Sequence, residues 1–341
     1  MTPRVAHPEL NPEPDLVVIG DCNPDVLVTG GDVTPAFGQQ EKLVDGIGLG
    51  IGGAAAITAV AAARLGLRTA LVAAIGDDPA GDFMLGQLAA VGVDTGGVVV
   101  RPGQPTGMTV ALSRGSDRAI LTATGAMATL TAADIPGDLI RRARHLHVSS
   151  YFLLERSLGP GLPGVLAAAR RNGTTTSLDT NWDPALRWGD DTLRACLAET
   201  DVLLPNQAEA LYLSGEATID AAATALTGLG PRVVVKLGAR GALCADRDRW
   251  YRIELPARLD HPVVDTTGAG DCFNAGLIAG LRRGLGLPDA AALGCATGTA
   301  STAAVGGSGA RIELSAVLAQ SGRVTIRPIG PDVRDASTRS G

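Results

Sequence analysis

The chain has 341 residues with 45% hydrophobic and 19% charged side chains, which is typical of a soluble globular protein and unlike a disordered chain or a coiled coil. At roughly 150 residues per domain, this length allows one large α/β domain with an appendage, or two ordinary domains. The formal net charge is −6 with no basic run, and no stretch approaches ~18 uninterrupted apolar residues, so we expect neither nucleic-acid binding nor a membrane span.

The chain ends and the cysteines indicate the cellular setting. The N-terminal segment lacks the apolar region of an export signal, and residues 1–14 and 331–341 have little to bury, so we expect disordered ends. The five cysteines are widely spaced without a CxxC pair, which predicts neither a disulfide framework nor a structural zinc site. We therefore expect a cytoplasmic protein.

Short β-branched runs alternate with longer alanine-rich segments of helical period along most of the chain. The expected strands lie near residues 15–20, 69–75, 145–150, 174–179, 201–205 and 232–237. Because this alternation is the signature of βαβ units, it predicts a mainly parallel central sheet between two layers of helices, a three-layer α/β/α fold.

Two segments break this rhythm. Residues 25–52 and 106–125 each have the pattern of two strands without a helix between them. We expect residues 25–52 and 98–128 to form a small β-sheet lid over the edge of the α/β sheet, able to exclude water from a reaction. The α/β core would then comprise residues 15–24, 53–97 and 129–325.

Polar residues gather where the expected strands end, which is where ligands bind in open α/β sheets. They are Asp21, Asn23 and Asp25, then Gly76, Asp77 and Asp78, then Ser149 and Ser150, then Asp179 and Asn181, then Asn206 and Glu209, and finally Gly238 and Gly241. Loop Asp and Asn residues also cap helices and form turns, so each position taken alone is equally consistent with a structural role.

The first glycine-rich segment does not indicate a familiar nucleotide loop. The chain has only two lysines, Lys42 and Lys236, and neither lies in the GxxxxGK[ST] frame of a P-loop. A GxGxxG match at Gly48, Gly50 and Gly53 precedes a helical run. The first expected strand, however, lies about thirty residues earlier, so the match does not close a first βα unit and NAD binding is not favoured.

Two further pairs of residues have more than one interpretation. His145 and His147 lie on one face of an expected strand, a spacing that suits metal ligands but also ordinary buried histidines. Trp182 and Trp188 flank a loop at a strand end, where they could stack on a ligand or pack against the core or the lid.

The segment 264–276, VDTTGAGDCFNAG, is the most informative part of the chain. Phe273 and Leu277 share one helical face, so the turn Gly268-Ala269-Gly270 lies at a helix N-terminus. Unpaired N–H groups and the positive end of the helix dipole, together with the close approach that glycines allow, make this turn a candidate anion site.

Asp271 follows this turn directly, although a carboxylate beside an anion site should repel a phosphate. The conflict disappears if Asp271 is a general base. It would take the proton of an attacking hydroxyl while the neighbouring N–H groups stabilise a transferring phosphoryl group. The alternative is that Asp271 only caps the helix.

Around this segment the chain resembles the ribokinase-like (PfkB-type) carbohydrate kinases. DTTGAGDCFNAG is similar to the C-terminal signature of that family, and other family blocks occur in the expected order between about residues 15 and 320. These blocks are Asn23-Pro24-Asp25, Gly52-Gly53 with the following helix ending Arg64-Leu65-Gly66, Gly76-Asp77-Asp78, Pro205-Asn206-Gln207-Ala208-Glu209 and Lys236-Leu237-Gly238-Ala239-Arg240-Gly241.

The resemblance implies a ribokinase-like fold and ATP-dependent phosphorylation of a hydroxymethyl group on a sugar or sugar-like molecule. It implies that Asp271 is the base and that Gly268, Ala269 and Gly270 form the anion hole. The implied acceptor site is Asn23, Asp25, Gly52, Gly53 and the position of Ile57. The implied ATP site is Asn206, Lys236, Gly238, Gly241 and Thr266, with the helix near residues 288–304 beside the adenine.

The resemblance also implies ions and a partner. Asn206 and Glu209 would organise Mg²⁺ through water, which suits a metal that dehydrates reluctantly. A K⁺ ion near Asp265 and a homodimer formed through the lid are further expectations, because some relatives bind such an ion and often pair through their lids.

One position departs from the family pattern. Relatives usually have an asparagine four residues after the second glycine of the GG pair, where it contacts the sugar, and here that residue is Ile57. A lost amide leaves a substrate hydroxyl unpaired at a cost of ~1 to 3 kcal/mol, so an apolar wall here suits a nucleoside, a deoxy sugar or a different polyol. We expect a small-molecule kinase, with a nucleoside kinase of the same fold and a non-catalytic sugar- or nucleotide-sensing protein as alternatives.

Overall fold

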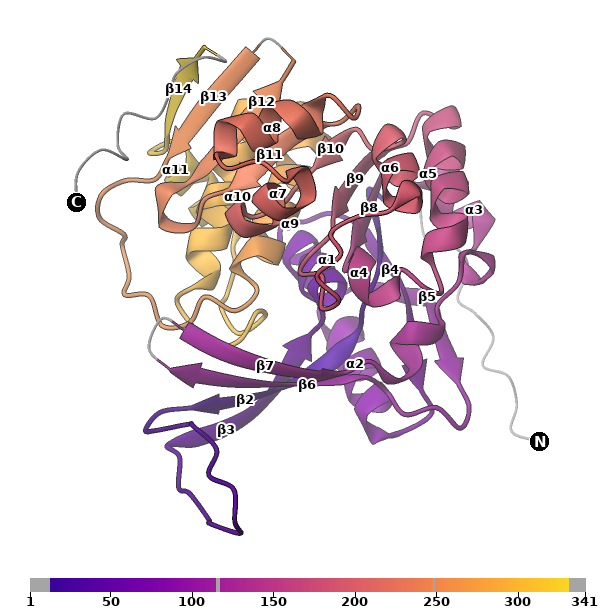
Figure 1. Cartoon of the computed structure of the whole chain (residues 1–341), viewed down its shortest axis with the longest axis vertical. Helices are drawn as coiled ribbons and strands as arrows, with labels where there is room; N and C mark the ends of the chain where they lie inside the picture. The colour runs from indigo at the N-terminus through magenta and orange to yellow at the C-terminus, as the bar shows by residue number, and fades with distance from the viewer. Residues whose placement is uncertain (1–12, 115–116, 248, 331–341) are drawn as a thin grey trace.

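The computed structural model describes residues 13–114, 117–247 and 249–330, in which ten strands form one large sheet and four strands form a small second sheet (Figure 1). Disordered ends were expected at residues 1–14 and 331–341, of which residues 1–12 and 331–341 lie outside the described residues. Residue Pro14 differs from that expectation, because it is buried and its carbonyl accepts a hydrogen bond of 3.1 Å from the Arg144 N–H. The three-layer architecture with a mainly parallel central sheet is confirmed.

Seven neighbouring strands of the large sheet are parallel, and three antiparallel strands extend one edge. In sheet order the parallel strands are β11 (Arg232–Lys236), β10 (Val202–Leu203), β9 (Thr175–Asp179), β8 (His145–Ser149), β1 (Leu16–Ile19), β4 (Thr69–Gly76) and β5 (Asp94–Arg101). The antiparallel strands are β12 (Ala242–Asp246), β13 (Arg249–Glu254) and β14 (Thr325–Ile329).

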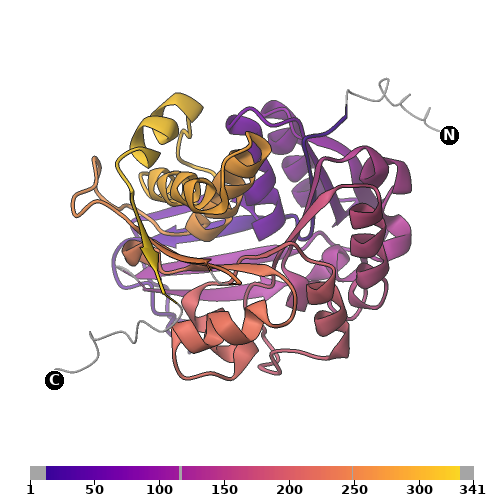
Figure 2. The same cartoon turned by 90° about the horizontal axis from the view of Figure 1, so that it is seen from above.

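Helices cover both faces of this sheet (Figure 2). Side chains of β1 alternate between the two layers, because Leu16 and Val18 face one layer while Val17 and Ile19 face the other. The first layer holds α1 (Ala54–Arg64), α2 (Pro79–Ala90), α9 (Ala269–Arg282), α10 (Leu287–Ser301) and α11 (Leu314–Ser321). The second holds α3 (Gly137–Arg142), α4 (Tyr151–Leu154), α5 (Leu162–Arg171), α6 (Asp191–Ala198), α7 (Gln207–Ser214) and α8 (Ile219–Thr227). Within the described part of the chain, no helix has both the length and the apolar character that crossing a membrane requires.

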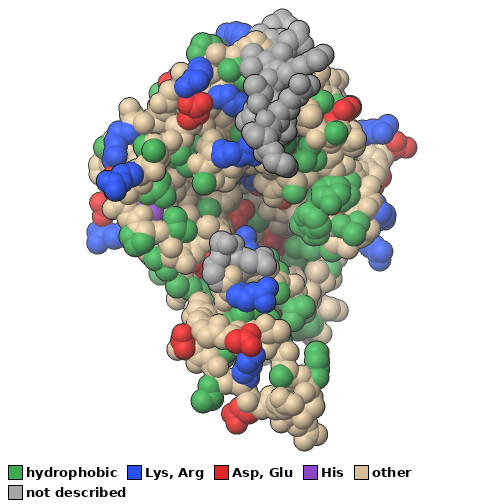
Figure 3. All heavy atoms as spheres, turned by 60° about the vertical axis from the view of Figure 1, so that its left-hand side comes forward, with side chains coloured by type: hydrophobic (Ala, Val, Ile, Leu, Met, Phe, Trp, Pro, Cys, Tyr) green, Lys and Arg blue, Asp and Glu red, His purple; other side chains and the backbone are tan. Residues whose placement is uncertain are grey.

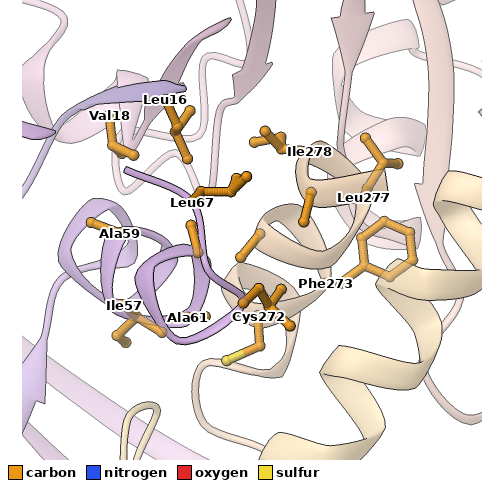
Figure 4. Close-up of a cluster of buried hydrophobic side chains, with 14 of the residues drawn as sticks. Leu16, Val18, Ile57, Ala59, Ala61, Leu67, Cys272, Phe273, Leu277 and Ile278 are labelled. Atoms are coloured by element: carbon orange, nitrogen blue, oxygen red, sulfur yellow. The ribbon is translucent and has the colours of Figure 1, made fainter. Parts of the chain in front are cut away.

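Helix α9, which begins at the glycine-rich turn, is held between α1 and α10. Cys272 and Phe273 of α9 pack in the same buried cluster as Ile57 of α1 (Figure 4). A Cβ atom on Gly276 would lie 2.3 Å from Thr297 Oγ1 of α10, so the glycine is required for the two helices to approach this closely. The first turn of α9 therefore has a rigid support.

The small sheet, which we name the lid, lies below the main body in Figure 1. Its strands are β2 (Asn23–Thr29), β3 (Gly46–Gly52), β6 (Met108–Arg114) and β7 (Asp117–Ala123), in the order β3-β2-β6-β7. The GxGxxG match is explained by this arrangement, because Gly48 and Gly50 lie in the lid strand β3 and not after the first strand of the main sheet.

The lid differs from the expected boundaries. Residues 98–101 belong to β5, which pairs with β4 in the main sheet, and residues 125–129 form the short 3-10 helix η1, whose Ala126 and Met127 are buried in the core. Asn23 and Pro24, expected in the core, already belong to β2.

Candidate active site

A cavity of about 910 Å³ lies between the lid and the carboxyl ends of the parallel strands. Figure 3 shows the molecule hollowed there, with acidic side chains in the depth of the hollow. Most of the expected site residues line this cavity: Asn23, Asp25, Gly53, Ile57, Asn206, Glu209, Lys236, Gly238, Gly241, Thr266, Gly268, Ala269, Gly270 and Asp271. Of the residues expected at the site, Gly52 and Asp265 lie behind the lining.

The turn that precedes α9 depends on Gly268. Its φ of 72° is in the left-handed region, and a Cβ atom would lie 2.4 Å from the Cα of Gly307. The N–H of Ala269 donates to the carbonyl of Thr266 at 3.2 Å, and the N–H of Cys272 closes the first helical bond to Gly268. Among the described residues, no main-chain acceptor is recorded for the N–H groups of Gly270 and Asp271, so these amides are available to an anion. The Ala269 amide, expected in the anion hole, is instead used inside the turn.

Asp271 lines the cavity directly after this turn. Gly268 is the N-cap residue of the helix, and Asp271 lies in the first turn, where a carboxylate also interacts favourably with the helix dipole. Burial, and secondly the negative charge of Asp179, hold the pKa of Asp271 well above its usual range. A carboxylate with a raised pKa is a stronger base, which is the property that proton abstraction from an alcohol requires.

A buried cluster of charged and polar groups lies beneath the turn. Lys236 Nζ forms an ion pair of 2.5 Å with Asp179 Oδ2, and the same oxygen accepts a hydrogen bond of 2.6 Å from Asn274 Nδ2 of α9. Lys236 Nζ is also 3.5 Å from the point where a Cβ atom of Gly270 would lie. Its charge therefore lies at the phosphate end of the expected ATP site and not beside the loop at Gly238.

The ammonium group stays charged in this setting. Burial lowers the pKa of Lys236, but the charges of Asp179 and Glu209 more than offset this, and the net shift is upward. Asp179 and Asn274 were not expected at the site. The two residues are 95 positions apart, so no sequence spacing indicates that they are in contact, although Asn274 lies within the signature segment.

Asn206 and Glu209 form a capping box at the start of α7. Glu209 accepts hydrogen bonds from the Asn206 N–H at 2.8 Å and from Asn206 Nδ2 at 2.6 Å, while Asn206 Oδ1 accepts one from the Glu209 N–H at 3.0 Å. Burial, and secondly Asp179, raise the pKa of Glu209 to about 7.

This pair suits Mg²⁺ in its donor chemistry, since carboxylate and amide oxygens are the ligands that this ion prefers. Both Glu209 oxygens already accept hydrogen bonds, so the pair fits an ion held through water. Among the described residues, no group of three or more His, Cys, Asp or Glu side chains is placed to hold a metal directly.

Asp25 of the lid strand β2 lies at the other end of the cavity. It is 7% exposed and accepts a hydrogen bond of 3.2 Å from Asn23 Nδ2, which also donates to Thr109 of β6 at 3.0 Å. Gly52 is required behind it, because a Cβ atom there would lie 1.8 Å from Asp25 Oδ1. Burial, and secondly the charge of Asp21, raise the pKa of Asp25 to about 7.

Asp21 has a structural function that the sequence pattern left open. Its two carboxylate oxygens accept hydrogen bonds from the N–H groups of Ala54 at 3.1 Å and Ala55 at 2.9 Å. It therefore fixes the first turn of α1 beneath the Gly52-Gly53 pair.

Ile57 forms part of an apolar wall. It is 3% exposed, and its Cγ2 lies 3.1 Å from the point where a Cβ atom of Gly268 would be. The side chain therefore supports the anion turn and faces the cavity at the same time. Ala111, Ile120 and Leu153 extend the apolar lining on this side.

The opposite end of the cavity is lined by small and apolar residues that suit a flat base. They are Gly238, Ala239, Gly241, Leu255, Leu259, Cys295, Gly298 and Thr299. This end includes α10, as expected for the helix near residues 288–304. Asp265 is not part of the lining, and it accepts hydrogen bonds from the N–H and hydroxyl of Thr267 and from the N–H of Gly306.

The structure shows what surrounds the histidine pair and the tryptophan pair. His147 is buried and its two ring nitrogens hydrogen bond to Ser177 and Ser149, while His145 bonds to Thr175 and Ser177, so both are satisfied inside the core. Trp188 is buried. Trp182 packs edge-on against Trp188 with ring centroids 4.8 Å apart, is 47% exposed, and lines the cavity.

Comparison with known proteins agrees with this geometry. A family model described as the pfkB family of carbohydrate kinases matches residues 13–313. The chain belongs to this family. Members carry out phosphoryl transfer to alcohols, so the protein is an ATP-binding phosphotransferase of the sugar and nucleoside kinase type.

Individual relatives cover most of this pfkB chain. It is 32% identical over 279 residues to a 2-dehydro-3-deoxygluconokinase of Bacillus subtilis, which covers 75% of this chain and 82% of the relative. It is 28% identical over 285 residues to a cytidine kinase of Thermococcus kodakarensis, which covers 82% and 93%. A ribokinase II of E. coli solved with ATP and Mg²⁺ superimposes with a TM-score of 0.79 at 25% identity, covering 91% of this chain and 99% of the other. ATP and Mg²⁺ are thus supported as ligands.

Proposed function

We propose that the protein transfers the γ-phosphoryl group of ATP to a hydroxymethyl group of a sugar or sugar-like acceptor bound between Asp25 and Asp271. The observation that carries this proposal is that Asp271, the open amides of the α9 turn and the lid carboxylate Asp25 line one cavity. Asp25 accepts hydrogen bonds from acceptor hydroxyls and orients the molecule. Asp271 then accepts the proton of the attacking hydroxyl.

Charge on the transferring group is stabilised from the protein side. The N–H groups of Gly270 and Asp271 donate to its oxygens, and Lys236 supplies a positive charge from beneath the turn. Mg²⁺, held through water by Asn206 and Glu209, neutralises part of the triphosphate charge. A K⁺ ion beside Asp265 is a further part of this proposal, and it is tested by comparing rates in KCl and NaCl.

The acceptor has two candidate classes. The hydroxyl groups of a sugar or sugar acid fit the acceptor oxygens of Asp25, and a nucleoside fits the apolar wall at Ile57 together with the half-exposed ring of Trp182. The test is a panel of sugars, 3-deoxy sugar acids and nucleosides with ATP and Mg²⁺, read by mass spectrometry of the phosphorylated product. Binding without turnover across the whole panel would instead support a non-catalytic sensor.

We also propose that two copies pair through the outer face of the lid. The cavity-lining residues of the lid alternate with apolar ones on its other face, where Ile47, Leu49 and Leu121 are 69%, 54% and 64% exposed. An apolar sheet face of this kind supports pairing with a second copy. The five cysteines are free and buried, which supports the expected cytoplasmic location.

A further inference from the structure

Arg118 of the lid strand β7 connects the lid to the turn before α9. Its Nη1 donates a hydrogen bond of 3.0 Å to the hydroxyl of Thr267, the residue that precedes Gly268. The Thr267 hydroxyl in turn donates to Asp265 Oδ1 at 2.8 Å, which fixes its orientation. The lid guanidinium therefore lies at the entrance of the anion turn.

The position of Arg118 matters because of the other charged groups that line the cavity. Four carboxylates line the cavity, those of Asp21, Asp25, Glu209 and Asp271. Two cations, Arg118 and Lys236, line it as well, and Lys236 is already paired with Asp179. Burial is the main influence on the carboxyl groups of Asp25 and Asp271, yet the charge of Arg118 also acts on both and lowers their pKa values. Arg118 is thus within electrostatic reach of the acceptor end and of the base.

We infer that Arg118 is a catalytic arginine carried by the lid, whose guanidinium contacts the oxygens of the migrating phosphoryl group. In the transfer, the bond from the γ-phosphorus to its bridging oxygen breaks and a bond to the acceptor oxygen forms. The acceptor proton passes to Asp271, and ADP leaves. Arg118 transfers no proton, and its planar fork of N–H donors stabilises the charge that spreads over the equatorial oxygens.

The position on the lid couples this contact to acceptor binding. β7 pairs with β6 and β6 with β2, so Arg118 and Asp25 belong to one small sheet. An acceptor held by Asp25 is therefore bound by the same small sheet that carries the guanidinium to the anion turn.

The alternative is that Arg118 binds a fixed negative group on the acceptor. We favour the phosphoryl group, because the hydrogen-bond partner of Arg118 adjoins Gly268. The inference rests on the proposed function, so the tests must separate the two.

The first test compares Arg118→Gln and Arg118→Lys with wild type, using the best acceptor of the panel. A matched control is Arg114→Gln, which removes the same charge from the same hairpin. Arg114 lies on the outer face, since Ser113 is the residue opposite Arg118. We expect kcat to fall by ~10² or more in Arg118→Gln with KM values changed by less than about threefold, and Arg114→Gln to match wild type. Arg118→Ala should regain part of its kcat with added guanidinium.

The second test measures binding by calorimetry. Arg118→Gln should bind ADP as wild type does, but bind ADP with Mg²⁺ and aluminium fluoride, a mimic of the transferring group, at least about tenfold more weakly. A wild-type kcat in Arg118→Gln, or a loss confined to the KM of acceptors that carry a carboxylate or phosphate, would overturn the inference. If wild type phosphorylates no acceptor, the proposed function is wrong, and calorimetry still tests whether Arg118 contacts the transferring group.

Discussion

At the scale of single residues, the cavity gathers carboxylates that would be more stable apart. Asp25 is buried and Asp271 is half-buried, and each lies near another acid, Asp21 and Asp179 respectively. Burial, and secondly the charge of the neighbouring acid, raise the pKa values of both groups. Such an arrangement costs folding free energy in the absence of ligands, and it gives the protein groups that respond to a bound hydroxyl or phosphate.

The cost is measurable at Asp25. Its pKa of about 7 in the folded protein exceeds the ordinary value of 3.8, so its contribution to stability is complete below pH ~4 and is lost as the pH rises through 7. We expect Asp25→Asn to be more stable than wild type at pH 8, by up to about 4 kcal/mol, and similar to it near pH 4. Urea unfolding of the ligand-free proteins at the two pH values tests this.

The control for Asp25→Asn is Asp138→Asn on the surface of α3, where the effect should be small at both pH values. A wild-type protein whose free energy of unfolding exceeds that of Asp25→Asn at pH 8 would contradict the assignment. Asp25→Asn should also lose acceptor phosphorylation, because the neutral amide no longer offers two acceptor oxygens to hydroxyls.

At the scale of elements, three pieces of chain meet under the anion turn. Lys236 ends β11, Asp179 ends β9 and Asn274 belongs to α9. We expect Lys236→Met to destabilise the protein by ~3 to 5 kcal/mol, because it leaves a buried carboxylate unpaired. Adding Asp179→Asn should recover a large part of that loss in chemical denaturation. A double variant no more stable than Lys236→Met would show that the ion pair is not the cause.

The turn before α9 gives a second prediction at this scale. Gly268→Ala forces a side chain into the left-handed region and against Gly307, so we expect a loss of ~1 to 3 kcal/mol in unfolding free energy and a fall in kcat. Gly164→Ala is the matched control, because it lies in α5 with open space around its Cβ position and should be neutral or stabilising. Equal thermal stability of the two variants would contradict this account of the turn.

The sequence predicted the strands and helices better than the contacts between them. The spacing of apolar residues and the polar residues at strand ends indicate β1, β4 and the helix at Asp271, because both signals come from neighbouring positions in the chain. The expected lid segment 98–128 was wrong at both ends, because residues 98–101 pair with β4 in the main sheet and residues 125–129 form a 3-10 helix. Both differences depend on contacts with distant parts of the chain. Contacts between distant segments, such as Arg118 with Thr267, leave no trace in a single sequence, although each residue of the pair is plainly visible in it.

At the scale of the whole molecule, the lid has two faces with different purposes. The inner face carries Asp25 and Arg118, and the outer face carries the exposed side chains of Ile47, Leu49 and Leu121. Because covering the outer face would also brace the inner one, pairing of two copies would hold both active sites in shape.

If two copies pair through the lid, substitutions on its outer face should separate the dimer into monomers. Leu49→Lys combined with Leu121→Lys should convert a dimer into a monomer in analytical ultracentrifugation at micromolar concentration, whereas Leu318→Lys on α11 should leave the dimer intact. A wild-type protein that sediments as a monomer throughout that range would refute pairing through the lid, without affecting the proposals for the cavity.

The measurement that tests the central claim most directly is single-turnover phosphoryl transfer by wild type and Asp271→Asn as a function of pH. If Asp271 is the base, the wild-type rate rises with pH around a pKa above the usual carboxyl range, and Asp271→Asn is slower by ~10² or more with nearly unchanged ATP affinity. A variant that keeps the wild-type rate, or one that loses rate only in proportion to lost ATP binding, would contradict the account.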